Sequence, residues 1–547
     1  MKKSFSRSRI RLSLGAMSVS ALVALFGLFL IQSNPMSVLA SPDLYEAGLA
    51  ADVTQAPLII TVDTTEDHTQ SDADSNNQNL LKYTCGFTQG SFFFPAPDGK
   101  CTLRRAIVES SARPQSDRTD GIFINFNIPA NDPNASLEVD GTWTVELDSV
   151  LPPMETDTIL DLNGSVTIDG STQPGGRTDG PPIIIDTGDT SLEIESTNNV
   201  IKHISWKNGG AIFIKNKADN NTIQNIWMGL SDDGQEIHFR DVNDRKRLAM
   251  GGMVVASDNN TVALNVISGA FAKAINIDGG DDNLITLNLI GTRADGTIPE
   301  VNEANECNPS FSYDPALWYG GWGLSLSGSR NEISNNIILS MHIMRSANDT
   351  SPVAIEIFGA DHLIANNRIG VDINGADEGV CGHAMNITGS GHEIAENVMA
   401  NTKVSFEEGE ESAMFSRDSS PLFGQNTIYG NIVRNGPGKI LIFSGNINSS
   451  LKFFKPARIT NIDGTSIEGQ AEEGFPCPDC TIDFYLDDTD DIEEAFEWLG
   501  SVDADSDGKF SFELPAALAT GEGLRTMATT NSSGVIGTFG PGTTSEA

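Results

Sequence analysis

A short phrase recurs along the middle of the chain and constrains its fold more than any other feature. Each copy opens on Asn, or in two cases on His, alternates apolar with polar residues, and closes on a second Asn; the first copy reads Asn221-Thr-Ile-Gln-Asn225-Ile. The shortest interval between copies is the 23 residues from Asn260 to Asn283. Longer intervals look like the same unit carrying a loop. The copies begin at Asn221, Asn260, Asn283, Asn331, His362, His392 and Asn426.

A repeat of this length is typical of stacked, solenoid-like proteins. The copies are rich in Ile, Val and Asn and are punctuated by Gly, which favours strands and turns over helices. The pattern therefore predicts an all-β fold, a parallel β-solenoid whose repeats run from about 196 to 435. Each turn is expected to supply two or three short strands, with Ile and Val pointing inward and Asn stacked at the bends.

The charge balance is strongly acidic, with 74 Asp and Glu against 34 Lys and Arg and a net charge of −40. Because binding to nucleic acid needs a basic face, this balance argues against a nucleic-acid partner. It suits an exported protein in a salty or calcium-containing medium, although solubility alone is the simpler explanation.

The first 40 residues have the pattern of a signal peptide. Basic residues precede an apolar run over 12–31, and Val38-Leu39-Ala40 offers a cleavage site. We expect residues 1–40 to be removed, 41–56 to form a linker, and the mature protein to be secreted or held in the cell envelope without inserting into the membrane. An uncleaved anchor is the alternative, because the apolar run is long for a signal. The basic residues are Lys2, Lys3, Arg7, Arg9 and Arg11.

Six Cys in an exported chain indicate disulfides. Pairing by neighbourhood predicts the bridges Cys85–Cys101, Cys307–Cys381 and Cys477–Cys480. Six Cys allow about 15 pairings, so the connectivity stays open at this point. The Cys-Pro-Asp-Cys spacing also resembles a redox motif, but no βαβ pattern surrounds it.

A resemblance becomes specific at Cys101-Thr-Leu-Arg-Arg-Ala-Ile107. This stretch resembles the signature of the CSLREA domain, a small module at the N-terminus of many secreted bacterial proteins. Arg105 stands where the signature has Glu, and Thr102 stands where it has Ser. The segments that follow, 122–126, 151–153 and 168–175, are similar to that family as well.

The resemblance covers roughly residues 57–450 and implies a right-handed parallel β-helix of the pectin-lyase type behind the N-terminal module. It implies export and architecture, but no settled activity. The predicted organisation is a cap over 57–143, the β-helix over 144–455 and a C-terminal β-sandwich over 456–547, where alternating strands recur.

The expected cap contains a helix over 102–112 with Thr102 as its N-cap. Such a helix would close the open end of the solenoid and cover its unpaired strand edges. Arg104 or Arg105 is expected to form a structural salt bridge rather than part of a binding site, because no other catalytic-looking residues cluster there.

Clustered carboxylates suggest one candidate catalytic site. Asp278, Asp281 and Asp282 lie close in sequence, with Lys273 before them and Arg293 after. Pectate lyases of this fold use such carboxylates to hold Ca²⁺ and a basic residue to remove a proton. The alternative is a solvated Gly-Gly loop without catalytic function.

A glycoside hydrolase of this fold is a second possibility, and the motif Gly391-His392-Glu393 is similar to part of its signature. Two carboxyl groups facing each other across the sugar cannot be assigned, however. His362 and His392 occupy the opening Asn position of the repeat, so stacking at a bend explains them better than catalysis.

Two insertions carry further candidates. Residues 235–250 include Arg240, Arg245, Lys246 and Arg247, the most basic patch of the mature chain. Residues 300–323 hold aromatic side chains that could stack on sugars, or could instead pack the loop against the solenoid. The predicted carbohydrate-binding residues are Tyr313, Trp318, Tyr319 and Trp322.

The C-terminal part offers a possible Ca²⁺ site at Asp503, Asp505 and Asp507, which alternate before Gly508 like the start of a calcium loop. A plain acidic turn is the alternative. Taken together, the sequence predicts binding of an extracellular or cell-envelope polysaccharide. A lyase or hydrolase acting on acidic glycans, and a structural adhesion protein, are the alternatives.

Overall fold

The structure is a computed structural model in which residues 55–547 form one compact unit. It describes residues 57–67, 85–89, 92–95, 99–156, 162–188, 190–236, 252–270, 273–298, 322–339, 353–403, 413–416, 425–436, 441–443, 454–471, 477–489, 494–531 and 544–545. Strands dominate these residues. Among them no helix is long and apolar enough to span a membrane.

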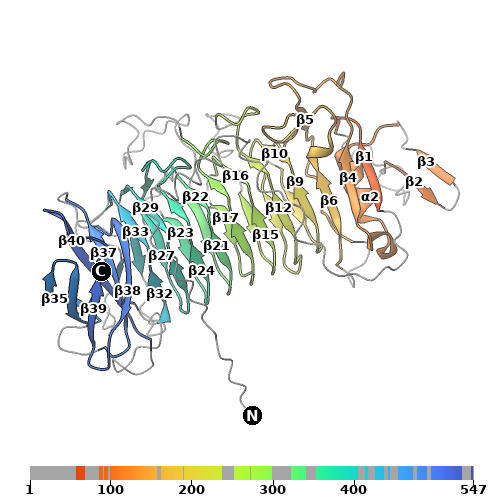
Figure 1. Cartoon of the computed structure of the whole chain (residues 1–547). Helices are drawn as coiled ribbons and strands as arrows, with labels where there is room; N and C mark the ends of the chain where they lie inside the picture. Colours follow the sequence, from red (N-terminus) through yellow and green to blue (C-terminus); the bar gives the residue numbers. More distant parts are fainter. Residues whose placement is uncertain are drawn as a thin grey trace, which may run out of the picture. The chain divides into compact units, whose positions relative to one another are not determined.

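Three long parallel sheets form a β-helix, as predicted (Figure 1). The largest has eleven strands in the order β1 (Leu58–Val62), β4 (Ile122–Phe126), β6 (Val166–Asp169), β9 (Val200–Lys202), β12 (Thr222–Gln224), β15 (Thr261–Ala263), β18 (Leu284–Thr286), β21 (Glu332–Ser334), β24 (Leu363–Ala365), β28 (Glu393–Ala395) and β32 (Thr427–Tyr429).

The second sheet has ten strands and the third has nine. The ten-stranded sheet consists of β5 (Trp143–Glu146), β7 (Ile183–Asp186), β10 (Ile204–Lys207), β13 (Trp227–Met228), β16 (Val266–Ile267), β19 (Leu289–Ile290), β22 (Ile337–Ile338), β25 (Arg368–Ile369), β29 (Val398–Ala400) and β33 (Ile432–Arg434). The nine-stranded sheet consists of β8 (Leu192–Ile194), β11 (Ile212–Ile214), β14 (Met253–Val255), β17 (Lys273–Ile277), β20 (Trp322–Leu326), β23 (Val353–Ile357), β27 (His383–Ile387), β31 (Met414–Ser416) and β34 (Leu441–Phe443).

Each rung passes from the nine-stranded to the eleven-stranded and then to the ten-stranded sheet, as in β17, β18 and β19. From β8 to β29 the first two bends of each rung are short. Over these rungs the third connection, back to the nine-stranded sheet, carries the long segments: 229–252, 291–321, 339–352, 370–382 and 401–413. Longer second bends, 127–142 and 170–182, occur only at the first rungs, and a longer first bend, 417–426, precedes β32.

Inward-facing Ile and Val stack rung upon rung in the core. One row runs through the eleven-stranded sheet in strict register, and every member is at most 1% exposed. Each such side chain contributes about 1.5–3 kcal/mol on burial. The row comprises Ile201, Ile223, Val262, Ile285, Ile333, Ile364, Ile394 and Ile428.

The repeated Asn residues form two buried ladders, one at each short bend. In both ladders, a side-chain atom accepts a hydrogen bond from the backbone N–H of the equivalent residue on the preceding rung. Asn288 Oδ1, for example, accepts from Asn265 N at 3.1 Å. The first ladder is Asn199, Asn221, Asn260, Asn283, Asn331, His362, His392 and Asn426. The second is Asn265, Asn288, Asn336, Asn367, Asn397 and Asn431.

The first copy of the repeat departs from this scheme. Ile226, rather than Asn225, takes the position of the closing Asn, and its backbone N–H donates to Asn265 Oδ1 at 2.9 Å. Asn225 instead holds the preceding left-handed position, with φ of 53°. Our alignment of Asn225 with the closing Asn was therefore wrong by one residue.

The N-terminal segment contributes directly to the β-helix. β1 and β4, within the predicted cap, are the first two strands of the eleven-stranded sheet, so the sheet begins well before residue 144. The predicted helix is α2 (Leu103–Ser111), and its N-cap Thr102 accepts a hydrogen bond from Arg105 N. A disulfide joins Cys85 to Cys101.

Arg104 of α2 is buried and makes the expected structural salt bridge. Its guanidinium binds both carboxylate oxygens of Asp67, at 2.8 and 2.6 Å, and donates to the carbonyls of Ser149 and Val150. A bidentate pair of this kind fixes the orientation of the helix on the first rungs.

The C-terminal residues form the predicted β-sandwich. One antiparallel sheet holds β35 (Arg458–Asp463), β36 (Ser466–Gln470) and β39 (Lys509–Glu513), and the other holds β38 (Glu497–Asp503), β37 (Thr481–Asp487) and β40 (Gly523–Thr529). Phe484 packs between the sheets, stacked on Phe512 with ring centroids 4.3 Å apart. The sequence did not predict β38. Another expected disulfide, Cys477–Cys480, precedes β37.

The sandwich also closes the last rung of the β-helix. Thr544 Oγ1 accepts from Ile428 N at 2.9 Å and donates to Asn426 O at 3.1 Å, while Val433 N donates to Ala495 O at 2.9 Å. These bonds pair part of the edges of β32 and β33 that a further rung would otherwise cover.

Candidate functional site

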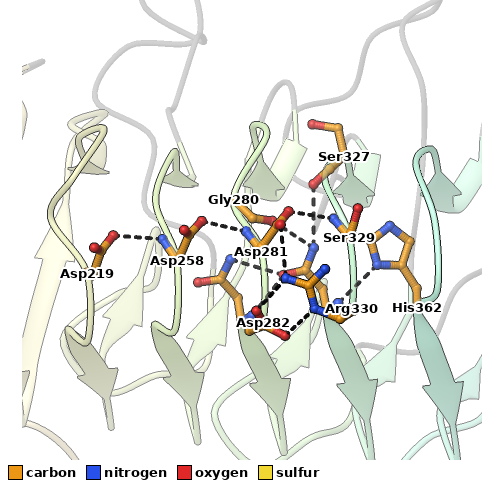
Figure 2. Close-up of polar contacts among 11 residues, drawn as sticks. Asp219, Asp258, Gly280, Asp281, Asp282, Ser327, Ser329, Arg330 and His362 are labelled. Atoms are coloured by element: carbon orange, nitrogen blue, oxygen red, sulfur yellow. Dashed lines mark hydrogen bonds and ion pairs between the residues drawn. The ribbon is translucent and has the colours of Figure 1, made fainter. Parts of the chain in front are cut away.

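The predicted carboxylate cluster lies at the bend between β17 and β18 and takes part in a ladder of its own (Figure 2). Asp219 Oδ1 accepts from Asp258 N at 3.0 Å, Asp258 Oδ1 from Asp281 N at 2.8 Å, and Asp281 Oδ1 from Ser329 N at 2.8 Å. These carboxylates therefore join successive rungs as the Asn ladder does. Asp278, by contrast, is exposed at the start of the bend.

Arg330 completes this cluster on the next rung. Its guanidinium holds Asp282 through two hydrogen bonds, at 2.8 and 2.7 Å, and reaches Asp281 at 3.1 Å. These bonds lower the pKa of Asp282 and raise that of Arg330. Asp282 and Arg330 both occupy left-handed positions, with φ of 55° and 57°. These contacts tie the bend to the next rung of the stack.

Lys273 lies elsewhere, on the nine-stranded sheet. Its Nζ is 2.6 Å from Ser325 Oγ on β20 and 3.4 Å from Glu356 Oε2 on β23. Ser325 Oγ in turn lies 3.4 Å from Glu356 Oε2. The pair is partly buried, with side-chain exposures of 30% for Lys273 and 15% for Glu356.

Asn386 follows Glu356 in the same register, on β27. The residue is 7% exposed, and its side-chain Oδ1 is buried without a hydrogen-bond partner. Buried polar atoms are normally paired, so an orphaned amide oxygen beside a carboxylate is unusual. Lys273, Ser325, Glu356 and Asn386 are hereafter the sheet-face cluster.

Three members of the sheet-face cluster, Ser325, Glu356 and Asn386, belong to a longer row along the outer face of the nine-stranded sheet. The members of the row lie in register on successive rungs. At several rungs the two neighbours of the row residue along its strand are buried apolar residues, such as Ile275 and Ile277 around Asn276. Rungs repeat at about 4.8 Å. The outer-face row is Glu193, Phe213, Val254, Asn276, Ser325, Glu356 and Asn386.

Charges on this face are matched in pairs. Lys215 Nζ lies 2.7 Å from Glu193 Oε1 and over the ring of Phe213, 5.3 Å from its centroid. Lys273 pairs with Glu356 in the same way. The described part of the face therefore combines neutral amide and hydroxyl groups, one aromatic ring and balanced ion pairs.

Arg293 does not join Lys273. It lies in the turn after β19, and its Nε donates to Gln235 O at 3.0 Å. This turn belongs to a stack that sequence reasoning missed: the pairs Gly229/Gly234, Gly291/Gly296 and Gly370/Gly375 all have positive φ at the same spacing. Ala294 N donates to Gly234 O at 3.0 Å, which joins two of the turns. The recurrent Gly-x₄-Gly spacing was the available signal.

The two histidines stack in the Asn ladder, as predicted. Their rings lie parallel with centroids 5.1 Å apart, and both residues are 1% exposed. Since His362 Nδ1 accepts from Asn331 N, the neutral ring carries its proton on Nε2, which donates to Phe358 O at 2.8 Å. Burial lowers the pKa of His362, and burial together with its neighbour lowers that of His392 to about 4.

Several predicted residues lie outside the described part of the chain. These are Tyr313, Trp318, Tyr319, the basic patch at 240–247, and Cys307, so the Cys307–Cys381 bridge is not described either. Trp322 is the first residue of β20, and its backbone pairs with Lys273 of β17. It therefore belongs to the sheet rather than to the insertion.

The predicted calcium ligands form a compact turn. Asp505 Oδ1 accepts from Asp507 N and Lys509 N, each at 2.8 Å, and Asp503 Oδ1 accepts from Thr481 Oγ1 at 2.8 Å. Within the described residues, no three His, Cys, Asp or Glu side chains are grouped so that they could hold a metal ion.

No protein-family model matches the chain, and no curated protein matches it in sequence. Function must therefore be judged from the fold and the outer-face row.

Proposed function

We propose that this protein binds an extracellular or cell-envelope polysaccharide along the outer face of the nine-stranded sheet. The outer-face row is the observation that carries the proposal. Its members recur at equal intervals of about 4.8 Å along the stack. A linear polymer of repeating units matches such an array better than a compact small molecule does.

The chemistry of the row supports the same conclusion. Sugars present apolar faces and many hydroxyl groups, and they are held by aromatic rings together with groups that both donate and accept hydrogen bonds. Phe213 supplies a partly exposed ring, and Asn276 supplies an amide on a rung further along. Several long connections lead into this sheet from the ten-stranded sheet, and loops on rigid scaffolds commonly carry binding residues.

The N-terminal sequence and the two described disulfides favour an exported protein, because disulfides persist in oxidising compartments. We place the chain with CSLREA-type secreted proteins as part of this proposal. The predicted Ca²⁺ site at Asp503, Asp505 and Asp507 is not part of this proposal, because the described side chains are not grouped as metal ligands. A purely structural adhesion protein is the competing function.

Affinity electrophoresis of the mature protein against neutral and acidic polysaccharides tests the proposal. Phe213→Ala should weaken retention several-fold, because it removes the described ring of the row. Leu284→Ala is the matched control: Leu284 is a partly buried apolar residue on the eleven-stranded sheet and should leave retention unchanged. If no polysaccharide retards the protein, the proposal is wrong.

A depolymerisation assay separates binding from catalysis. A lyase would release unsaturated sugars, and a hydrolase would release reducing ends without unsaturation. Lys273→Met is the informative variant, because Lys273 is the one residue of the predicted catalytic set on this face. Product release that Lys273→Met abolishes would replace the binding proposal with an enzymatic one.

A further inference from the structure

We infer that the sheet-face cluster of Lys273, Ser325, Glu356 and Asn386 is a subsite that binds the hydroxyl groups of a neutral sugar residue in preference to a uronic acid. This inference rests on the proposed function and specifies the substrate class of the same face.

The orphaned amide oxygen of Asn386 is the first support. Asn386 is more than nine-tenths buried, and its Oδ1 has no hydrogen-bond donor. A buried acceptor without a hydrogen bond lowers the free energy of unfolding, so the Oδ1 of Asn386 does not stabilise the free protein. A ligand hydroxyl that donates to Oδ1 would remove this cost, and the site would then reject analogues that lack the hydroxyl.

The arrangement around Asn386 is built from a rigid scaffold. Ser325, Glu356 and Asn386 occupy one register on the consecutive strands β20, β23 and β27. Lys273 reaches across from β17 to Ser325 and Glu356. Four adjacent rungs thus position an amide, a carboxylate, a hydroxyl and an ammonium group side by side.

These groups complement a pair of neighbouring sugar hydroxyls. One hydroxyl can donate to Asn386 Oδ1, and a second can donate to Glu356 while it accepts from Lys273. Hydroxyls can serve as donor and acceptor at once, whereas an ionised carboxylate only accepts.

Charge selects against an acidic sugar at this position. The ammonium group of Lys273 is already paired with Glu356, 3.4 Å away. The carboxylate of a uronic acid would meet the carboxylate of Glu356 and an amide oxygen that needs a donor, and like charges at short range repel. Polyuronate binding would need an excess of positive charge, which the described part of the face does not have.

Isothermal titration of the mature protein with neutral and uronic-acid oligosaccharides tests the inference. Asn386→Ala should weaken binding of the neutral ligand about tenfold, equivalent to about 1.4 kcal/mol. Glu356→Gln should weaken neutral binding and reduce the discrimination against uronic acids. Leu284→Ala on the eleven-stranded sheet serves as the control and should change neither affinity.

Thermal unfolding without sugar adds an independent readout. Since Asn386 Oδ1 is unpaired in the free protein, Asn386→Ala should leave the melting temperature unchanged or raise it, whereas a structural Asn would show a loss. A marked drop in the melting temperature would overturn the inference.

The failures of the two proposals are distinguishable. If glycans bind and Phe213→Ala weakens them while Asn386→Ala and Glu356→Gln do not, the subsite is wrong and the proposed function stands. If uronic-acid ligands bind more tightly than neutral ones, the assignment of a neutral sugar is wrong. If nothing binds, the proposed function itself is overturned.

Discussion

Replacing Asn288 with Ala should destabilise the middle of the β-helix severely. Asn288 Oδ1 accepts from the backbone and side-chain nitrogens of Asn265, and its Nδ2 donates to Val262 O and to Asn336 Oδ1, all at 2.9–3.1 Å. Every one of these groups is buried, so water cannot replace the lost side chain without entering the core.

The expected magnitude follows from the orphaned partners. A buried polar group left without a partner costs about 1–3 kcal/mol. The substitution leaves the Asn265 N–H without an acceptor and removes one hydrogen bond from each of the other partners. Small shifts of the surrounding residues recover part of the lost free energy. We therefore expect the free energy of unfolding to fall by about 3–5 kcal/mol, at the upper end for point substitutions.

Urea unfolding followed by hydrogen exchange measures this loss and locates it. Exchange at the amide of Asn265 should accelerate more than exchange in the first rungs. Leu287→Asn, one position earlier, is the control: Leu287 is 38% exposed with φ of 57°, a conformation that Asn tolerates better than Leu, so stability should hold or rise. A change of less than about 0.5 kcal/mol for Asn288→Ala would refute the structural role of the ladder.

Three further substitutions test buried groups in the last rungs and in the C-terminal sandwich. Burial raises the pKa of Asp483 to about 7 from an ordinary 3.8, so the free energy of unfolding of the wild type should fall by up to about 4 kcal/mol as pH rises from 4 to 7. Asp483→Asn should remove this pH dependence, which urea unfolding at several pH values measures. The pKa of His392, lowered from 6.5 to about 4, has the opposite effect: its contribution to stability is full above pH 6.5 and falls toward pH 4. His392→Asn should keep the ladder and remove this acid sensitivity. Melting curves of both proteins at pH 4.5 and 7.5 measure the difference, and equal pH dependence would contradict the prediction. Thr544→Val removes both hydrogen bonds to the last rung and should cost about 1–3 kcal/mol, with faster proteolysis near β32 as the readout; unchanged cleavage would show that Thr544 does not close the stack.

Much of the fold was predictable because its signal is local and periodic. An Asn or His at a fixed place in each repeat indicates a bend without any knowledge of which residue it binds. The stacking of His362 and His392 could therefore be predicted. The helix at Thr102 and five strands of the sandwich have equally local signals, whereas the uneven pattern of β38 did not resemble an alternating strand.

The candidate site was less predictable because register brings it together. Asp281 bonds to Ser329, 48 residues later, and nothing near Asp281 in sequence marks a backbone N–H as its partner. Lys273 was predicted as catalytic with Asp278 and Arg293, but its contacts, Ser325 and Glu356, come from the next two rungs. These contacts depend on how β17, β20 and β23 align with one another, and the long insertions between the strands hide that alignment in the sequence.

The corner that carries the long connections of the middle rungs, β8 to β29, has a consequence for protein engineering. In these rungs the two short bends and their Asn ladders set the register, so a foreign loop grafted at the third corner need not disturb the stack. The connection between Ile267 and Lys273 shows how little sequence this corner requires. Loops grafted there would project from neighbouring rungs at intervals of about 4.8 Å. The chain thus offers a scaffold for displaying peptides in a ruled, one-dimensional array.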